Sequence, residues 1–445
     1  MANIGIISLG CAKNAFDVEA GIANLITAGH VVAGDLNNID AVIINTCGFI
    51  KSARDEADEN IAEMIELKKN SNPNLKIIVT GCYSQKFSKE LKEKFPKIDS
   101  LYGIEMHKDI VDITEKTLLK NTVSEIKDIS DTWVEPQNGR FPISNFWTGN
   151  LKISEGCNNQ CSYCGIPAIR GNLRSRNIEL ALAEAKIMAE EGVNEINIIA
   201  QDITAYGSDL GKDKYLVDLL ENLNSINGIE WIRLMYTYPT SIDDSLIEAI
   251  CTIPKVLHYL DMPIQHSHPE IIKSMNRRGS SEEYLELIQK LREKISDICL
   301  RTTFIVGYPG ENEEFFSHLL EFAKKAKFDR AGIFGYSPEI DTPAYNLKDR
   351  ISEEIVNERV SKLKKVLESI SANKNKKNVG KNMMVLIEDF DEKYLYGRTF
   401  RDALDIDGFV RITSKKARKM ETLLGKIIEI KITNTLGIFD LAGYF

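Results

Sequence analysis

The loop at 155–166 carries three cysteines within eight residues: Cys157, Cys161 and Cys164, here called the central triad. Cysteine thiolates are the usual protein ligands of iron–sulfur clusters, and three of them can hold three irons of a four-iron cluster. No fourth cysteine follows nearby, so the fourth iron would stay open to a substrate or cofactor. A structural zinc site usually takes four protein ligands, commonly as two pairs, and no second pair is visible. The spacing therefore favours an iron–sulfur cluster over zinc.

This spacing, with aromatic Tyr163 directly before the last cysteine, resembles the radical S-adenosylmethionine (SAM) superfamily. The resemblance implies that the open iron binds SAM and that Tyr163 lies near the adenine. Packing within the loop is the alternative role for this ring. The resemblance also makes Gln201 and Asp202 candidates for the SAM pocket, because they follow the second predicted barrel strand and strand ends at a barrel mouth favour ligand contacts. Capping of their own loop is the alternative for this pair.

Three further cysteines, far apart in the sequence, each follow a short apolar segment in the first 120 residues. This N-terminal triad consists of Cys11 after residues 3–9, Cys47 after 41–45 and Cys82 after 75–79. Helix-like segments at 14–29 and 51–69 separate the strands, and such alternation predicts a parallel sheet. Because ligands gather at the carboxyl ends of parallel strands, we expect the three thiols to converge there. A lone cysteine is more often a small buried side chain, but three at equivalent positions indicate a second ligand set.

A second alternating series begins at 152–155. Its further predicted strands lie at 195–200, 231–236, 259–262, 300–306 and 331–336. Six strand–helix units predict an open, barrel-like parallel sheet. A long amphipathic helix at 352–374 is followed by five short segments with turns between them, at 383–388, 394–399, 408–412, 426–433 and 438–441. Such a run predicts a small antiparallel barrel, so the fold class is α/β with a terminal β-barrel.

The composition is that of an ordinary globular protein. The chain has 445 residues, 43% of them hydrophobic and 27% charged, with a net charge of −9. This mild acidic excess argues against general coating of nucleic acids, although a local basic patch stays open. The longest apolar runs have about ten residues, against the ~20 that span a bilayer, and no signal peptide is recognised. We expect a cytoplasmic, reducing compartment, in which cysteines are more often ligands or catalysts than partners in disulfides.

Two cysteine triads followed by a small barrel occur in the order typical of the radical SAM methylthiotransferases, and this resemblance covers nearly the whole chain. The implied parts are an N-terminal methylthiotransferase domain at 1–120, a linker at 121–142, a radical SAM domain at 143–374 and a TRAM domain at 375–445. The resemblance implies that the N-terminal triad holds an auxiliary 4Fe-4S cluster and that the central triad holds the radical SAM 4Fe-4S cluster. The TRAM domain would engage the macromolecular substrate.

Several motifs are similar to those of the RimO group, whose members modify ribosomal protein S-twelve. They are SLGCAKN at 8–14, NTCGFI at 45–50, KISEGC at 152–157, YLDMPIQH at 259–266 and GRTFRDA at 397–403. The tRNA-modifying MiaB group usually has a Gln-Met-Asn run after its first cysteine and lacks the acidic stretch found here at 402–407. That stretch would repel RNA phosphates and suit a basic protein loop. Val18 and Phe87 depart from the family pattern, but neither removes a ligand.

The terminal barrel also carries a basic run, Lys415, Lys416, Arg418 and Lys419. Over 376–445 there are 13 basic and 10 acidic residues, so the charge of this part does not by itself decide the partner. The basic run could face ribosomal RNA, a tRNA or water.

The resemblance implies methylthiolation of the β-carbon of an aspartate in ribosomal protein S-twelve, with two SAM per turnover, one as methyl donor and one as radical source. An unactivated C–H bond has no acidic proton, so a cofactor must open it. A low-potential electron donor such as flavodoxin or ferredoxin is also implied. One alternative is methylthiolation of a tRNA adenosine next to the anticodon. A remote alternative is a non-catalytic, metal-bound scaffold that binds ribosomes, which an open iron disfavours.

Other chemically capable residues have simpler expected roles. Two roles are open for the arginines after the central triad: they could neutralise a carboxylate, or lie on a solvated charged face, which is the more common explanation. They are Arg170, Arg174 and Arg176. His266 and His268 are expected to pack at a strand end or contact substrate, because no carboxylate or cysteine stands at ligand spacing. Cys251 and Cys299 are expected to be buried.

Overall fold

The computed structural model describes residues 1–36, 38–119, 121–122, 124–143, 146–413 and 420–445. Contacts divide the chain into two compact units. The N-terminal unit comprises Met1–Ser144, Ser154–Ser175 and Ser337–Tyr345, and the barrel unit comprises Asn145–Ile153, Arg176–Tyr336 and Asn346–Phe445. The domain boundaries expected at 120, 142 and 374 stay predictions. No helix within the described ranges is long and apolar enough to cross a bilayer.

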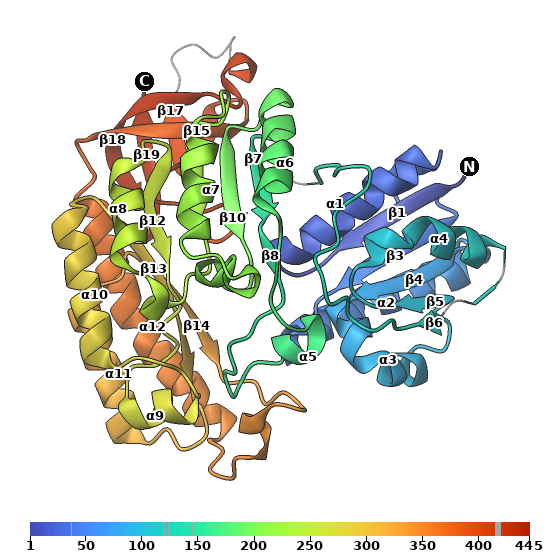
Figure 1. Ribbon diagram of the computed structural model, residues 1–445, viewed down its shortest axis with the longest axis horizontal. Helices are drawn as coiled ribbons and strands as arrows, with labels where there is room; N and C mark the ends of the chain where they lie inside the picture. The colour runs from blue at the N-terminus through green and yellow to red at the C-terminus, as the bar shows by residue number, and fades with distance from the viewer. Residues whose placement is uncertain (37, 120, 123, 144–145, 414–419) are drawn as a thin grey trace. The chain divides into compact units, whose positions relative to one another are not determined.

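The N-terminal unit is built on six parallel strands in the order β2-β1-β3-β4-β5-β6 (Figure 1). They are β1 (Asn3–Ser8), β2 (Val31–Ala33), β3 (Ala41–Thr46), β4 (Lys76–Gly81), β5 (Ser100–Tyr102) and β6 (Ser124–Glu125). The parallel sheet and its three main strands are therefore confirmed. Strands β2, β5 and β6 are not predicted from the sequence, because two or three residues are too few to show a period.

Helices cover both faces of this sheet. They are α1 (Ala12–Thr27), α2 (Lys51–Asn70), α3 (Cys82–Lys94) and α4 (Ile110–Leu118). Alternate side chains of β3 serve the two faces: Val42 and Ile44 pack with α2 and α3, whereas Ala41 and Ile43 pack with α1 and α4. All four are fully buried, as expected for a strand between two helical layers.

The polar segment expected to be a linker packs against α1 of the same unit. Trp133 meets Phe16 edge-on, with 6.1 Å between ring centroids. The Arg140 guanidinium lies 2.5 Å from the Glu19 carboxylate. The described residues of this segment therefore pack as part of the N-terminal unit. The unit also contains the short antiparallel pair of β8 (Ser154–Glu155) and β9 (Arg174–Ser175), with α5 (Ile166–Arg170) between them.

The barrel unit contains a six-stranded, fully parallel sheet in the order β14-β13-β12-β11-β10-β7. Its strands are β7 (Thr148–Lys152), β10 (Glu195–Ile199), β11 (Trp231–Leu234), β12 (Val256–Asp261), β13 (Cys299–Val306) and β14 (Arg330–Gly335). Its helices are α6 (Ile178–Glu190), α7 (Tyr215–Asn224), α8 (Asp244–Thr252), α9 (Pro269–Ser274), α10 (Ser281–Lys294), α11 (Glu313–Ala326) and α12 (Glu353–Lys376). The predicted open barrel of six strand–helix units is thus confirmed (Figure 1).

Polar caps fix where several of these helices begin. Asn177 accepts a hydrogen bond from the Glu179 amide at 2.8 Å and starts α6. Asn312 accepts one from the Phe315 amide at 2.8 Å and starts α11. A side-chain oxygen at the cap satisfies an amide that has no partner within the helix. Both helices connect parallel strands of the same sheet, so the carboxyl ends of these strands lie along one edge.

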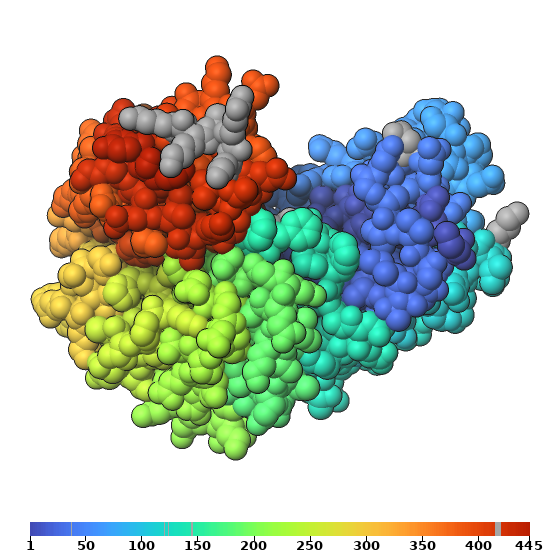
Figure 2. Space-filling view, turned by 90° about the horizontal axis from the view of Figure 1, so that it is seen from above, coloured from blue at the N-terminus to red at the C-terminus, as the bar shows by residue number. Residues whose placement is uncertain are grey.

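Five strands close into the C-terminal barrel, in the order β15-β16-β17-β19-β18. They are β15 (Asn382–Phe390), β16 (Tyr394–Thr399), β17 (Val410–Thr413), β18 (Ile427–Leu436) and β19 (Asp440–Tyr444). The five strands confirm the predicted barrel, but one neighbouring pair, β17 with β19, is parallel. In Figure 2 this barrel, in red, lies directly against the green and yellow parts of its own unit.

Candidate functional site

The N-terminal triad lies at the carboxyl edge of three neighbouring strands. Cys11 stands between β1 and α1, Cys47 follows β3 directly, and Cys82 is the first residue of α3 after β4. In the sheet order β1, β3 and β4 are adjacent, so the three chain segments leave the sheet side by side. The Sγ atom of Cys47 lies 3.4 Å from where a β-carbon on Gly10 would stand. The expected convergence of the three cysteines is therefore observed.

The three thiols of this triad differ in environment. Desolvation raises the pKa of the Cys82 thiol to about 12, and the charges of Cys11 and Cys47 add to the rise. Desolvation also raises the pKa of Cys47, although the Phe49 amide opposes it. At Cys11 desolvation acts in the same direction, but the charges of Lys13 and Arg170 outweigh it and the pKa is lowered. Three neighbouring thiolates repel one another, and a bound cation or cluster would relieve that repulsion.

Asn14 ties the loops of this triad together. Its Nδ2 donates to the carbonyl oxygens of Leu9 at 3.1 Å and Thr46 at 3.2 Å, which precede Cys11 and Cys47. Its Oδ1 accepts from the Cys82 thiol at 3.4 Å. Asn14 is 1% exposed, so each of these bonds is made away from solvent. A single buried amide thus holds all three cysteine segments in register.

The central triad lies in the loop that joins β8 to α5. The Cys157 amide donates to the Gly171 carbonyl at 3.1 Å, and the Cys164 amide donates to the Cys161 carbonyl at 3.0 Å. Gly156 has a φ of +76°, and a β-carbon there would stand 2.0 Å from the Asn172 carbonyl oxygen. All three sulfur-bearing residues are partly exposed. The loop is therefore closed on itself by backbone bonds while its thiols remain accessible.

Both triads fit iron–sulfur clusters by their donor chemistry. The central triad offers three thiols from one loop and the N-terminal triad offers three from neighbouring strand ends, and thiolates are the ligands that such clusters take. Among the residues that the structure describes, no three His, Cys, Asp or Glu side chains are arranged to hold a single metal ion. Ligands of a four-iron cluster each bind a different iron, so they do not need to share one coordination point. The residues thus suit a cluster better than a lone zinc.

Two of the predicted SAM-pocket residues, Gln201 and Asp202, lie in the barrel unit after β10, whereas Tyr163 lies in the N-terminal unit, in the loop of the central triad. The Asp202 carboxylate accepts from the Thr204 amide at 3.0 Å and caps the short 3-10 helix η2 (Ile203–Ala205). Capping, the alternative considered for this residue, is therefore one role that it does fill. The Tyr206 hydroxyl donates to the Arg176 carbonyl at 2.7 Å, which braces the same loop. The roles of Tyr163, Gln201 and Asp202 toward SAM stay predictions.

The expectation that the arginines after the central triad are solvated is wrong. Arg170, Arg174 and Arg176 are all at most 4% exposed. Arg174 pairs with Glu105 at 3.0 Å, and Arg176 pairs with Glu184. Neutralisation of a carboxylate, the alternative role, is what the structure shows, because buried guanidinium groups require such partners. Glu184 lies 8 residues from Arg176, whereas Glu105 lies 69 residues from Arg174. Sequence spacing alone could not reveal them.

His266 belongs to a buried polar network that the sequence analysis missed. Its Nδ1 accepts from the His268 amide at 3.0 Å, so the neutral ring carries its proton on Nε2. Nε2 then donates to Glu311 at 3.2 Å, and Arg359 donates to the other oxygen of Glu311 at 2.8 Å. Packing at a strand end, one of the two expected roles, describes this histidine. The partner carboxylate follows β13, 45 residues away, beyond the reach of a local motif.

The two cysteines outside the triads differ from each other. Cys299 is buried, as expected, and desolvation raises its pKa to about 12. Cys251 is exposed, contrary to expectation, because it lies on the outer side of α8.

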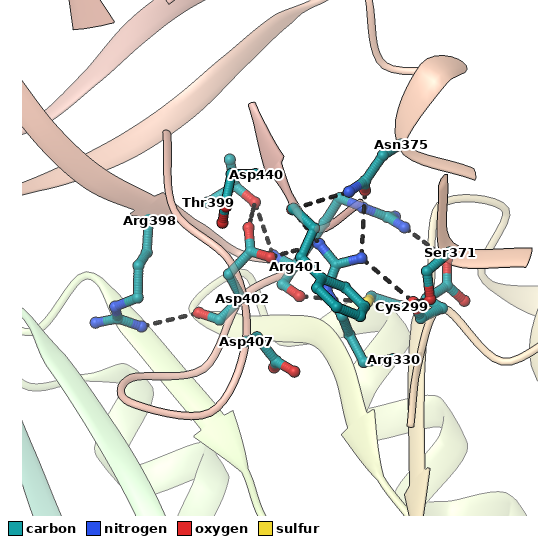
Figure 3. Close-up of polar contacts among 12 residues, drawn as sticks. Cys299, Arg330, Ser371, Asn375, Arg398, Thr399, Arg401, Asp402, Asp407 and Asp440 are labelled. Carbon is teal, nitrogen blue, oxygen red and sulfur yellow. Dashed lines mark hydrogen bonds and ion pairs between the residues drawn. The ribbon is translucent and has the colours of Figure 1, made fainter. Parts of the chain in front are cut away.

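Two of the three carboxylates in the acidic stretch of the C-terminal barrel, Asp402 and Asp407, form internal ion pairs, whereas Asp405 is exposed. Asp402 is 2% exposed and pairs with Arg330 at 2.6 Å (Figure 3). Asp407 accepts from the Tyr259 hydroxyl at 2.7 Å and lies 3.6 Å from Arg301. The expected repulsion of RNA by this stretch therefore rests on the exposed Asp405 alone, because Asp402 and Asp407 are paired with arginines inside the unit. The basic run at 415–419 lies outside the described residues.

Three families match successive parts of the chain. Residues 3–103 match the family described as "Uncharacterized protein family UPF0004". Residues 151–323 match "Radical SAM superfamily". Residues 379–445 match "TRAM domain". The three matched ranges contain the N-terminal triad, the central triad and the C-terminal barrel, respectively.

Curated relatives match the whole length. The ribosomal protein uS12 methylthiotransferase RimO of Clostridioides difficile is 41% identical over 444 residues, covering 100% of this chain and 98% of that protein. The RimO protein of Acetivibrio thermocellus is 40% identical over 448 residues, covering 99% of this chain and 97% of its own length. The RimO protein of Geobacter sulfurreducens is 41% identical over 444 residues, covering 99% and 98%.

Solved structures share the fold at low sequence identity. The radical SAM methyltransferase TsrM from Kitasatospora setae, with cobalamin and a 4Fe-4S cluster bound, has a TM-score of 0.53 and 14% identity. The match covers 77% of this chain and 73% of TsrM. The cobalamin-dependent SAM radical enzyme OxsB has a TM-score of 0.50 and 12% identity, covering 83% of this chain and 56% of OxsB. This likeness supports the architecture described above.

Proposed function

The chain belongs to the RimO family of ribosomal protein uS12 methylthiotransferases, and from this membership we propose that it adds a methylthio group to ribosomal protein uS12. The observation that carries the proposal is an identity of about 40% with RimO relatives along the whole chain. The target is the β-carbon of an aspartate, as the resemblance of the motifs implies. No observation on the chain favours a tRNA adenosine as the target instead.

The cofactors are two 4Fe-4S clusters and SAM. We assign the auxiliary cluster to Cys11, Cys47 and Cys82. We assign the second cluster to Cys157, Cys161 and Cys164, whose three thiolates leave one iron for SAM. These groups supply the radical that opens an unactivated C–H bond and the methylthio group that replaces the hydrogen, with two SAM consumed per turnover.

The residues of the chain position these groups and limit access to them. Asn14 keeps the three segments of the N-terminal triad in register through its bonds to Leu9, Thr46 and Cys82. Gly156 lets the loop of the central triad pass against the Asn172 carbonyl, where any side chain would collide. Burial of Cys82 keeps water from one side of the auxiliary site. Rigid placement of the reacting groups is what a short-lived radical requires.

The partners beyond uS12 follow from the same assignment. Reductive chemistry at a cluster needs a one-electron donor of low potential, and we propose a flavodoxin or a ferredoxin. Because the substrate is a ribosomal protein, we propose that the reaction takes place in the cytoplasm.

An anaerobic assay tests the function directly. The cluster-reconstituted chain is incubated with SAM and a strong reductant, with purified uS12 in one tube and unmodified tRNA in another. Mass spectrometry then looks for an added methylthio group. We expect it on an aspartate of uS12 and not on tRNA. A gain on tRNA alone would refute the proposed substrate, and no gain on either would refute the proposed activity.

Cysteine variants test the ligand assignment in the same assay. Cys11→Ala and Cys157→Ala should each abolish methylthiolation and remove iron from one triad only. The matched control is Cys251→Ala, which removes an exposed cysteine outside both triads and should leave iron and activity unchanged. Equal iron in Cys11→Ala and Cys251→Ala would contradict the assignment of the auxiliary cluster.

A further inference from the structure

Arg170 connects the two cysteine motifs within the N-terminal unit. It is the last residue of α5, and it is 2% exposed. Its Nη1 donates to Glu155 at 2.7 Å, two residues before Cys157 of the central triad. Its Nη2 donates to Asn14 Oδ1 at 2.6 Å, three residues after Cys11 of the N-terminal triad. One buried cation is thus bonded to residues of both motifs.

Carboxylates hold this cation in place. Asp17 Oδ2 lies 3.2 Å from both Nη1 and Nη2, and Glu155 accepts from Nη1 as well. A buried guanidinium has lost its hydration, and close carboxylates offset that desolvation penalty. The guanidinium of Arg170 is therefore held by three side chains from two segments of the unit: Asn14 and Asp17 on α1, and Glu155 on β8.

The same charge acts on the sulfurs of the N-terminal triad. The Asn14 Oδ1 atom that accepts from Arg170 Nη2 at 2.6 Å also accepts from the Cys82 thiol at 3.4 Å. The guanidinium and this sulfur therefore share one oxygen of a buried amide. A positive charge this close to a sulfur ligand favours the more negative state of a group bound there.

We propose that Arg170 is a positioning residue that raises the reduction potential of the cluster held by the N-terminal triad, with Asp17 limiting its effect. This inference rests on the proposed assignment of Cys11, Cys47 and Cys82 as cluster ligands. Net charge and hydrogen bonds to sulfur are the levers by which a protein sets the potential of such a cluster. Arg170 supplies a positive charge at this site and reaches the Cys82 thiol through the shared Asn14 oxygen, and its bond to Glu155 makes the effect depend on the loop of the central triad.

The test isolates one cluster in the full-length chain. Cys157, Cys161 and Cys164 are all replaced by alanine, so that only the N-terminal triad can hold iron. Iron content is measured first, and the midpoint potential of the cluster is then followed by electron paramagnetic resonance during a redox titration. In this background, Arg170→Met should lower the equilibrium constant for reduction at least tenfold, about 59 mV for a one-electron couple. Arg170→Lys, which keeps the charge, should change it less than threefold.

A second variant tests the sign independently. Asp17→Asn removes the carboxylate that limits Arg170 but leaves the arginine in place, so the potential should rise. This variant also decides the proposal if Arg170→Met fails to retain its cluster. The matched control is Arg174→Met, which removes another buried cation from the same loop, paired with Glu105 instead. In Arg174→Met the equilibrium constant for reduction should stay within threefold of that in the triple-alanine background.

The outcomes separate this inference from the proposed function. If the triple-alanine background holds no iron although Arg170 is intact, the ligand assignment itself is wrong. If iron is present and Arg170→Met matches Arg174→Met in potential, the role of Arg170 is refuted. A fall of the potential in Asp17→Asn would refute it equally.

Discussion

The guanidinium of Arg330 donates to the carboxylate of Asp402 at 2.6 Å, and both side chains are at most 3% exposed (Figure 3). Arg330 begins β14 of the six-stranded sheet, whereas Asp402 follows β16 of the C-terminal barrel. A second buried bridge runs beside it, from Arg401 of the barrel to Asp329 at 2.5 Å. Charged bridges therefore fix the barrel to the sheet within one unit.

Removal of one partner from this bridge should destabilise the barrel unit strongly. Asp402→Ala leaves the Arg330 charge buried and uncompensated, which typically costs about 3–5 kcal/mol. We expect guanidinium unfolding curves to show a loss of this order in the free energy of unfolding. The double variant Arg330→Met with Asp402→Leu removes both charges and should regain most of the loss. Glu358→Ala, at an exposed ion pair, should leave the curve unchanged, and an Asp402→Ala curve equal to it would contradict the prediction.

Asp329 should make stability depend on pH. Its carboxylate accepts from Arg401 at 2.5 Å and from Lys374 at 2.6 Å. Desolvation acts to raise the pKa of Asp329, but these two charges outweigh it and the pKa is lowered. An unfolded aspartate has a pKa of about 3.9. The ionised group therefore stabilises the fold above about pH 4, and this contribution is lost as the pH falls through the lower folded pKa.

The variant Asp329→Asn tests this dependence when its free energy of unfolding is compared with that of the natural chain at several pH values. At pH 7 the variant should be clearly less stable than the natural chain in urea, because Arg401 and Lys374 lose their counter-charge. As the pH falls below about 4 the two curves should approach each other, since the natural carboxyl group is then protonated. Asp405→Asn, at an exposed position, is the control: its free energy of unfolding should differ from that of the natural chain by the same small amount at each pH. A difference for Asp329→Asn that stays constant down to pH 3 would be inconsistent with the prediction.

The fold could be predicted wherever apolar segments were long enough to show a period. The strands ending before Cys11 and Cys47, and five strands of the six-stranded sheet, have four or more residues and were located to within a few positions. The first strand of that sheet was misplaced, because the predicted segment at 152–155 overlaps β7 only at Lys152 and otherwise covers β8. The parallel β17–β19 pair could not be predicted, because the direction of a strand depends on closure of the barrel rather than on its own residues. The acidic stretch was misplaced for a similar reason, since Arg330 and Arg301 lie far away in the sequence.

Accessibility and pKa together predict opposite reactivity for the two cysteines outside the triads. Cys251 is exposed, whereas Cys299 is buried with its pKa raised to about 12. At pH 8 a thiol with such a pKa is ionised to roughly one part in 10⁴, and the thiolate is the form that reacts. Iodoacetamide should therefore label Cys251 in the folded chain and Cys299 only after unfolding in guanidinium. Peptide mass spectrometry measures both sites at once, and early labelling of Cys299 would show that β13 opens.

Asn14 should be essential for iron in the N-terminal triad. Asn14→Ala removes the bonds to Leu9 and Thr46 and releases the segments that carry Cys11 and Cys47. We expect iron in this triad to fall severalfold while the central triad keeps its own. Asn24→Ala is the matched control, because Asn24 is a buried asparagine of the same helix, ten residues after Asn14. Its Nδ2 donates to the His107 carbonyl instead of to a segment of the triad. Similar iron contents for the two variants would show that Asn14 does not organise the triad.

The candidate site could be predicted only where residue type and strand order sufficed. The convergence of Cys11, Cys47 and Cys82 follows from three parallel strands ending at one edge, which alternation already indicates. The second layer around them could not be predicted. Asn14 and Arg170 look like ordinary polar residues in sequence, and their importance comes from burial beside segments distant in the chain.

Gly156 should be required for the loop of the central triad. It adopts a φ of +76°, and a β-carbon there would stand 2.0 Å from the Asn172 carbonyl oxygen, a backbone atom that cannot swing aside. Gly156→Ala should therefore displace Cys157, which bonds to the neighbouring Gly171 carbonyl, and remove iron from the central triad. Gly211→Ala provides the control: its φ of +64° carries a similar backbone penalty of roughly 1–2 kcal/mol, but no atom lies within 4 Å of the new carbon. Iron analysis and SAM cleavage should separate the two variants, with Gly211→Ala retaining both. If Gly156→Ala keeps full iron, the close approach to Asn172 is not what shapes the cysteine loop.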